Sequence, residues 1–337
     1  MHINYSKGRI DFYSTLFNFM KVKIGEIILT KFLIIDGNSL GCRAAFAHNP
    51  KSGPDLHTQR GLPTGTIYRF INMFDRILHQ IRPTHIVVAW DTDKNTFRKQ
   101  LDPEYKANRT SKKKSNIDMD VVYHQFEAIR KILEKLGVKN VNVKGFEGDD
   151  ICGTYATLSK ADDNFIVTGD KDSFQLVNTN TTIVFPKNGF REVSLINEKY
   201  IDEHYGLDVC QFIDLKTLQG DKSDNIRGLN GCGEKTALKL LEKYGSAESI
   251  VKLNNDDLSA DVNKKVLAGF DEWKSRFDML MTLVTIRRDV PVEYTYDDCE
   301  IDLLNWEAAK PIFEKLELKN ILNRISWTAM YAQTYFM

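Results

Sequence analysis

The sequence predicts an α/β fold built on a mostly parallel sheet. Short apolar runs alternate along the chain with segments whose apolar residues recur at helical spacing, and this alternation requires crossover connections between parallel strands. Several of the apolar runs end in an acidic residue. The carboxyl ends of parallel strands meet at one edge of a sheet, which is where ligands bind in such folds. We therefore expect a single acidic sheet edge.

Composition narrows the class of protein. The 337 residues are 42% hydrophobic and 27% charged, enough for a large core in one domain or in one domain with a smaller companion. The 46 basic and 46 acidic residues give no net charge. The five cysteines form no Cys-x-x-Cys pair, which favours a reducing compartment over a disulfide framework or zinc ribbon. No apolar run approaches the ~20 residues of a membrane span, so we expect no membrane partner.

The first predicted elements are two strands and a helix. Residues 1–31 are interpreted as a peripheral extension without catalytic residues. The first strand is predicted at residues 32–36, an apolar run that ends in Asp36. An amphipathic helix is predicted at residues 64–80, and a second strand at residues 85–91 again ends in an acid.

The most acidic turn lies at residues 145–150, after a short predicted strand at residues 140–143. Three of its carboxylates fall within four positions, and two unit charges about 4 Å apart repel by roughly 4 kcal/mol at an effective dielectric near 20. Acids at a helix start can also simply complement the helix dipole. Further strands are predicted at residues 165–170, ending in Asp170, and at residues 182–185.

These strand-end acids indicate a divalent-metal site. An acid after one strand is usually a turn or cap residue. Four acidic turns on one edge, with no cluster of histidines beside them, are harder to explain in that way. Ligands that are all oxygen favour magnesium or manganese over zinc or copper.

Residues 92–115 form a basic segment directly after the second strand. Its basic residues are Lys94, Arg98, Lys99, Lys106, Arg109, Lys112, Lys113 and Lys114. An isolated run of this kind is usually a solvated loop. Because this one emerges beside the acidic edge with Tyr105 among its charges, it suits a backbone phosphate and a stacked base. A helix at residues 118–136 is predicted to return to the core.

A glycine-spaced turn at residues 228–233 follows a predicted helix at residues 209–218 and two further acids. It is not a P-loop, because Glu234 occupies the position where the nucleotide motif needs lysine. Small turns that open a helix expose backbone N–H groups that bind phosphate, and nucleotide phosphate and DNA phosphate both fit. Lys235 and Lys239 would add contacts that position a strand without reading its sequence.

Seven motifs occur along the chain, at residues 61–68, 83–88, 96–98, 103–109, 167–172, 211–216 and 231–238. Together, and in this order, they resemble the 5′ nuclease family, which includes the 5′-nuclease domain of bacterial DNA polymerase I, phage 5′-exonucleases and flap endonucleases. The resemblance covers about residues 32–283 and continues more faintly over residues 313–322. No polymerase-like segment follows it, so we expect a free-standing nuclease of phage or bacterial type.

The resemblance implies a Rossmann-like (PIN-like) sheet with a helical arch over the active site and a helix–three-turn–helix DNA-binding element. The arch is expected at about residues 92–125. The implied parts are an N-terminal extension at 1–31, a catalytic core at 32–208, a DNA-binding region at 209–290 and a C-terminal region packing on the core at 291–337.

The resemblance also implies the site residues. The family's metal-binding acids correspond to Asp36, Asp91, Glu147, Asp149, Asp150, Asp170, Asp172, Asp221 and Asp224. The expected DNA contacts are Arg98, Tyr105, Lys106, Arg109, Lys216, Gly231, Gly233, Lys235 and Lys239. The catalytic residues would be Lys106, Arg109, Asp170 and Asp172. Two positions depart from the family: Gly148 replaces the usual alanine, and Arg227 replaces the proline of polymerase-linked members.

The implied activity is metal-dependent 5′-3′ exonuclease and 5′-flap endonuclease hydrolysis of DNA, in replication or repair, through two metal ions. We expect Mg²⁺, with Mn²⁺ able to replace it, and the family's hairpin can also hold K⁺. The expected partner is branched or nicked duplex DNA with a free 5′ end or flap, or an RNA–DNA primer duplex. We expect a monomer in the cytoplasm of a bacterium or of a phage-infected host.

Two other classes of function remain open. A phosphatase would use an Asp-x-Asp motif such as Asp91-Thr-Asp93, but the threonine expected two positions later is Asn95. A DNA-binding protein without catalysis would not need the complete set of acids.

Overall fold

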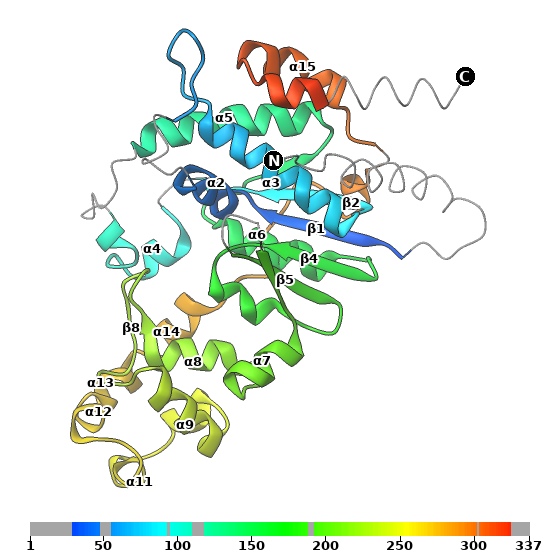
Figure 1. The fold of residues 1–337 in the computed structure, drawn as a ribbon. Helices are drawn as coiled ribbons and strands as arrows, with labels where there is room; N and C mark the ends of the chain where they lie inside the picture. The colour runs from blue at the N-terminus through cyan, green and yellow to red at the C-terminus, as the bar shows by residue number, and fades with distance from the viewer. Residues whose placement is uncertain are drawn as a thin grey trace, which may run out of the picture.

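The computed structural model describes residues 29–47, 55–92, 95–109, 118–187, 192–301 and 303–324. Its centre is a six-stranded sheet with the order β3-β2-β1-β4-β5-β6 (Figure 1). The strands are β1 (Lys31–Asp36), β2 (His85–Ala89), β3 (Lys139–Val141), β4 (Asp163–Val167), β5 (Thr181–Lys187) and β6 (Glu192–Ile196). Only β6 pairs antiparallel, with β5. The predicted α/β class with a mostly parallel sheet is confirmed.

Helices cover both faces of the sheet because its central strands are apolar on both sides. Along β1, Leu33 and Ile35 join one buried cluster, whereas Phe32 and Ile34 join the other, as the alternation of side chains along a strand requires. The first cluster lies under α2 (Gly37–Phe46), α3 (Gly65–Ile81), α5 (Met119–Lys135) and α15 (Trp306–Lys315). The second lies under α6 (Gly148–Leu158), η3 (Lys171–Leu176) and α7 (Glu198–Tyr205).

The second cluster continues into a helical region at the end of the molecule opposite α15 (Figure 1). This region starts with α8 (Gln211–Gln219) and a small hairpin of β7 (Gly220–Asp221) and β8 (Ile226–Arg227). Its other elements are α9 (Glu234–Tyr244), α10 (Ala247–Val251), α11 (Asn255–Ser259), α12 (Lys264–Ala268), α13 (Phe270–Ser275) and α14 (Phe277–Val284). The sheet and this helical region therefore share one continuous core.

The predicted arch is only partly described. It contains α4 (Phe97–Leu101) and the single turn η2 (Ala107–Arg109). Another short turn, η5 (Asp297–Cys299), precedes α15. Lys94, Lys112, Lys113 and Lys114 lie outside the described residues, as do residues 1–28 and 325–337. Among the described residues, no helix combines the length and the apolar character that crossing a membrane would require.

The sheet order places a change of direction between β1 and β4. From β1 the chain adds β2 and β3 on one side and then returns to add β4 and β5 on the other. Ligands bind at such a switch point, outside the carboxyl ends of the strands. Asp36 ends β1, Asp91 follows β2 by two residues and Asp170 follows β4 by three. The topology therefore brings three predicted site acids to one edge.

The β7–β8 hairpin depends on a close approach of two glycines, which yields a stability prediction. A Cβ added to Gly228 would overlap the backbone nitrogen of Gly220 and the carbonyl oxygen of Leu218. Because these backbone atoms cannot move without distorting the hairpin, we expect Gly228→Ala to lower the free energy of unfolding by about 1–3 kcal/mol. Urea unfolding of the two proteins measures this difference.

Gly233→Ala is the matched control. A Cβ at Gly233 would meet no atom within 4 Å, and the backbone φ there is −93°. We expect this substitution to leave the free energy of unfolding nearly unchanged, and equal losses in both variants would contradict the close-approach argument.

Candidate functional site

The acids at the ends of β1 and β4 are fixed by hydrogen bonds to neighbouring turns. Asp36 caps α2: its Oδ1 accepts from the backbone N–H of Ser39 at 2.9 Å, and its Oδ2 accepts from Thr168 Oγ1 at 3.0 Å. The same threonine oxygen accepts from the backbone N–H of Asp170 at 3.1 Å. Burial, followed by the charge of Asp91, raises the pKa of Asp36 to about 7, so this carboxylate already lies among like charges.

Gly148 marks the point where two of these carboxylates converge. Its backbone N–H donates to Asp91 Oδ1 at 2.7 Å. A methyl group on Gly148 would lie 3.3 Å from Asp91 Oδ1 and 3.7 Å from Asp36 Oδ1. Burial and the neighbouring Asp150 raise the pKa of Asp149 well above its usual range. The start of α6 therefore faces the strand-end acids and adds to the negative charge.

A second group of acids surrounds Lys216. Its Nζ forms ion pairs with Asp172 and, at 2.6 Å, with Asp221. Burial and the charge of Asp170 raise the pKa of Asp172 to about 6. Burial also acts on Asp221, but hydrogen bonds from Lys216 and Ser223 outweigh it and lower the pKa of Asp221 to about 2. Lys216 therefore serves as the internal counter-ion of this group.

A third group joins the arch to the acidic turn. Tyr105 donates its phenol O–H to Glu147 Oε2 at 2.9 Å and to Asp224 Oδ2 at 3.2 Å. Lys106 Nζ lies 2.9 Å from the same glutamate oxygen and 3.6 Å from Asp224 Oδ2. Tyr105 is only 3% exposed, so its ring offers no face to a stacked base in this conformation.

Arg98 and Asp150 form a buried ion pair, with side chains 2% and 0% exposed. Arg98 Nη1 and Nη2 donate to Asp150 Oδ2 and Oδ1 at 2.8 and 2.7 Å. Its other donors reach the carbonyls of Leu283 and Thr285, both at 2.9 Å. All of these donors are occupied within the protein, so Arg98 has a structural role in this conformation. Its contact with DNA stays a prediction. Both carboxylate oxygens of Asp150 accept from Arg98, and its role as a metal ligand likewise stays a prediction.

The nine predicted acids thus form neighbouring groups instead of one continuous cluster. Among the described residues, no set of three or more His, Cys, Asp or Glu side chains is gathered closely enough to hold a metal ion as it stands. Lys106 and Lys216 each pair with two of these carboxylates and offset part of their charge. The donor set itself fits a hard divalent cation, because it consists of carboxylate oxygens. Burial, followed by the charge of a neighbouring aspartate, raises the pKa values of Asp36 and Asp172.

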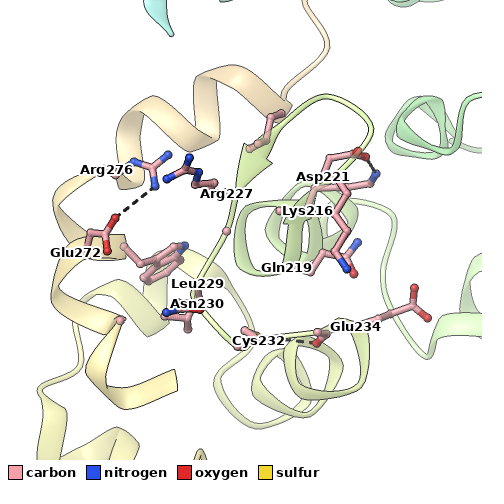
Figure 2. Close-up of a pocket in the computed structure, with 18 of the residues that line it drawn as sticks. Lys216, Gln219, Asp221, Arg227, Leu229, Asn230, Cys232, Glu234, Glu272 and Arg276 are labelled. Atoms are coloured by element: carbon pink, nitrogen blue, oxygen red, sulfur yellow. Dashed lines mark hydrogen bonds and ion pairs between the residues drawn. The ribbon is translucent and has the colours of Figure 1, made fainter. Parts of the chain in front are cut away.

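A pocket of about 920 Å³ connects the second acidic group with the glycine turn (Figure 2). Lys216 and Asp221 lie on one side, the turn at residues 228–234 crosses the middle, and Glu272 and Arg276 lie on the opposite side (Figure 2). Trp273 also lines the pocket. Gly231 requires the left-handed conformation (φ +81°), and Gly233 begins α9 without a side-chain cap. The backbone N–H groups at the start of α9 are therefore available to an anion.

The pocket adds basic residues that sequence reasoning missed. Arg227, Lys265 and Arg276 all line it, and the arginines lie close together in Figure 2. Arg276 also pairs loosely with Glu272, at 3.9 Å. The predicted contacts Lys235 and Lys239 are exposed on α9. The side chain of Arg109 lies outside the described residues.

Comparison with known proteins agrees with this architecture. A family profile described as "5′-3′ exonuclease, N-terminal resolvase-like domain" matches residues 31–206, and "5′-3′ exonuclease, C-terminal SAM fold" matches residues 207–307. DNA polymerase I of Bacillus subtilis is 34% identical over 297 residues, which cover 88% of this chain and 32% of that protein. DNA polymerase I of Lactococcus lactis is 37% identical over 272 residues, which cover 80% and 30%. The chain therefore spans about a third of the length of these relatives.

Solved structures share the fold. The 5′-exonuclease of bacteriophage T5 with bound zinc superposes with a TM-score of 0.60 at 23% identity, covering 87% of this chain and 98% of that one. The bacteriophage T5 flap endonuclease in complex with DNA and metal ions gives a TM-score of 0.62 at 23% identity, covering 85% and 99%.

The Arg98–Asp150 pair yields a prediction that separates a structural role from DNA contact. Removing one partner of a buried ion pair leaves an uncompensated charge, so we expect Arg98→Ala to lower the free energy of unfolding by about 3–5 kcal/mol. The measurement is urea unfolding without DNA and with a chelator present. Arg287→Ala is the control: Arg287 pairs with Asp289 at the surface, where the side chains are 43% and 65% exposed, and such pairs contribute less than about 1 kcal/mol. Normal stability of Arg98→Ala together with weaker DNA binding would instead support a direct contact between Arg98 and DNA.

Proposed function

The chain belongs to the 5′-3′ exonuclease family, and we propose that it is a metal-dependent 5′-3′ exonuclease and structure-specific 5′-flap endonuclease that hydrolyses phosphodiester bonds in DNA. One observation carries the proposal: the carboxylates at the sheet edge share Lys216 and Asp221 with a pocket that has basic side chains and a glycine turn. A DNA strand that is bound by its phosphates at the pocket would therefore extend to the acids.

The acids would hold two or more divalent cations, Mg²⁺ or, in its place, Mn²⁺. Asp36, Asp91, Glu147 and Asp149 would serve one end of the site, and Asp170, Asp172 and Asp221 the other. Asp224 would act directly or through water, and Asp150 through the position it gives to α6. When bound, paired divalent cations supply an activated water nucleophile and stabilise the leaving oxygen of a phosphodiester.

The basic residues of the arch would act on the phosphate. Lys106 and Arg109 would stabilise the charge that develops on the phosphoryl oxygens. In this structure Lys106 pairs with Glu147 and lies near Asp224. Once these carboxylates hold cations, the ammonium group of Lys106 would be free to contact the phosphate. The ammonium group of Lys216 would leave Asp172 and Asp221 and contact a phosphate in the same way.

The pocket and the glycine turn would hold the duplex by its backbone. The N–H groups near Gly231 and Gly233, together with Lys235, Lys239, Arg227 and Arg276, would contact phosphates. Such contacts position DNA without reading its sequence. A monovalent cation such as K⁺, bound by the backbone carbonyls of the turn, would also contact a DNA phosphate.

We assign the parts of the chain as follows: extension 1–31, catalytic core 32–208 with the arch at about 92–125, DNA-binding region 209–290 and C-terminal region 291–337. The proposed substrates are branched or nicked duplexes with a free 5′ end or flap, including RNA–DNA primer duplexes, bound by a monomer. The bacterial origin of the relatives agrees with a place in the cytoplasm of a bacterium or an infected host.

Cleavage of a labelled 5′-flap duplex with and without Mg²⁺ tests the proposal. We expect cutting only with the metal.

The Asp170→Asn variant tests the acidic site itself. We expect it to reduce the rate of cleavage by more than about a hundredfold at saturating Mg²⁺ while DNA binding stays near normal. The reason is that even residues that contact metal ligands from behind affect activity 10–100-fold. Asp202→Asn, an exposed acid on α7, is the control and should cut normally. Binding without cutting would instead favour a DNA-binding protein without catalysis, and wild-type turnover of Asp170→Asn would refute its role.

The arch lysine and arginine give a separate prediction. We expect Lys106→Ala and Arg109→Ala each to slow single-turnover cleavage by about 10²–10³-fold, the usual effect of removing a group that stabilises transition-state charge. DNA affinity, measured by fluorescence anisotropy, should change much less. Lys160→Ala is the control, because Lys160 pairs with Asp297 at an exposed site. Equal losses in rate and affinity would mean that the arch only tethers the DNA.

A further inference from the structure

Two asparagines join the arch to the turn that carries Asp221 and Asp224. Asn225 donates its side-chain amide to the carbonyl of Glu104 at 2.7 Å. In the opposite direction, Asn108 donates its amide to the carbonyl of Lys222 at 2.8 Å. Each segment therefore supplies one asparagine that bonds to the main chain of the other. Between these two bonds, the backbone N–H of Lys106 donates to the carbonyl of Asp224 at 2.8 Å.

The backbone at this junction adopts an uncommon conformation on both sides. Lys106 has φ +55° and Asn225 has φ +59°, both in the left-handed region. Asparagine visits this region more readily than other residues with a side chain, but lysine does not. Such a conformation persists only where the surroundings determine it. The bonds from Asn108 and Asn225 flank Lys106 and, together with its own N–H bond to Asp224, can hold it there.

The backbone conformation of Lys106 sets the direction of its side chain. From this backbone position the ammonium group reaches Glu147 Oε2 at 2.9 Å and lies 3.6 Å from Asp224 Oδ2. The neighbouring Tyr105 reaches the same two carboxylates through its O–H. A change in the backbone at residue 106 would therefore move both groups relative to these acids.

We infer that Asn108 and Asn225 are positioning residues for cleavage, which hold the backbone of Tyr105 and Lys106 beside Glu147 and Asp224, so that the ammonium group of Lys106 lies within reach of the reacting phosphate. This inference rests on the proposed nuclease function. Neither asparagine carries charge, and both hydrogen bonds lie at partly exposed sites, so their loss should alter the local geometry without unfolding the protein. Their effect on the rate should pass through Lys106.

The test uses Asn225→Gly, which keeps the left-handed backbone accessible and removes the amide, and Asn108→Ala, which removes the other amide. Amide hydrogen exchange at Lys106, measured in the full chain without DNA or metal, reports the bond to Asp224. Single-turnover cleavage of a 5′-flap duplex with Mg²⁺ reports the rate. Each variant is also combined with Lys106→Ala. Arg82→Gly is the control, because Arg82 is left-handed (φ +54°) at the end of α3.

We expect exchange at Lys106 to be faster in both variants and cleavage to be about tenfold slower, the effect of losing about one hydrogen bond. DNA affinity and the midpoint of unfolding should stay near wild type, and Arg82→Gly should match wild type throughout. In the Lys106→Ala background the additional effect of either variant should nearly vanish, because residues that act through one group are not additive.

Unchanged exchange at Lys106 would overturn the inference, and so would rate losses that persist in full when Lys106 is absent. These outcomes are distinct from a failure of the proposed function. If the wild-type chain does not cut DNA, the nuclease proposal fails and takes the inferred role in cleavage with it. If the wild type cuts and neither variant differs from it, the nuclease proposal stands and the two asparagines have no positioning role.

Discussion

The buried pair of Arg98 and Asp150 constrains the whole site. A charge taken out of water is tolerated only when its partners satisfy it completely, and here every guanidinium N–H has an acceptor, on Asp150, on Glu147 or on the carbonyls of residues 283 and 285. Asp150 accepts in return from the backbone N–H groups of Glu147 and Arg287. One ion pair thus ties α4 of the arch, α6 of the acidic turn and the end of α14 together.

The site around this ion pair carries a local excess of negative charge, although the chain as a whole is neutral. The 46 basic residues equal the 46 acidic ones, but the acids at the strand ends lie close together. Burial, followed by the charge of Asp91, raises the pKa of Asp36 to about 7. Lys106 and Lys216 offset part of this charge from within the site. Because an ammonium group on a long side chain can move, this neutralisation is reversible in a way that the Arg98 pair is not.

Much of the fold follows from patterns that are local in sequence, whereas the missing parts depend on distant partners. The strands ending near Asp36, Asp91 and Asp170 were predictable because apolar runs stop at an acid, and helix α3 because its apolar residues keep one period over 17 residues. Strand β6 was missed because it is a partly exposed edge strand without a continuous apolar run. The internal ion pair of Arg98, which was predicted only as a DNA contact, was missed because its acceptors lie 49 to 187 residues away. Arg276 joins the pocket only through the packing of α13, which no local pattern predicts.

The acids differ in what holds them, and this difference divides the site into a rigid part and an adjustable part. Asp36 and Asp91 accept backbone N–H groups at the starts of α2 and α6, so they cannot move without disturbing helices that pack on the core. Glu147 and Asp224 also accept from the side chain of Tyr105 and lie beside Lys106, whose backbone is left-handed, although Glu147 takes part in the capping box of α6 as well. A displacement of the arch would therefore change the second pair of acids while leaving the first pair in place. The sequence could supply the number of carboxylates, but this asymmetry arises only from the folded chain, because it depends on whether main-chain or side-chain groups hold each acid.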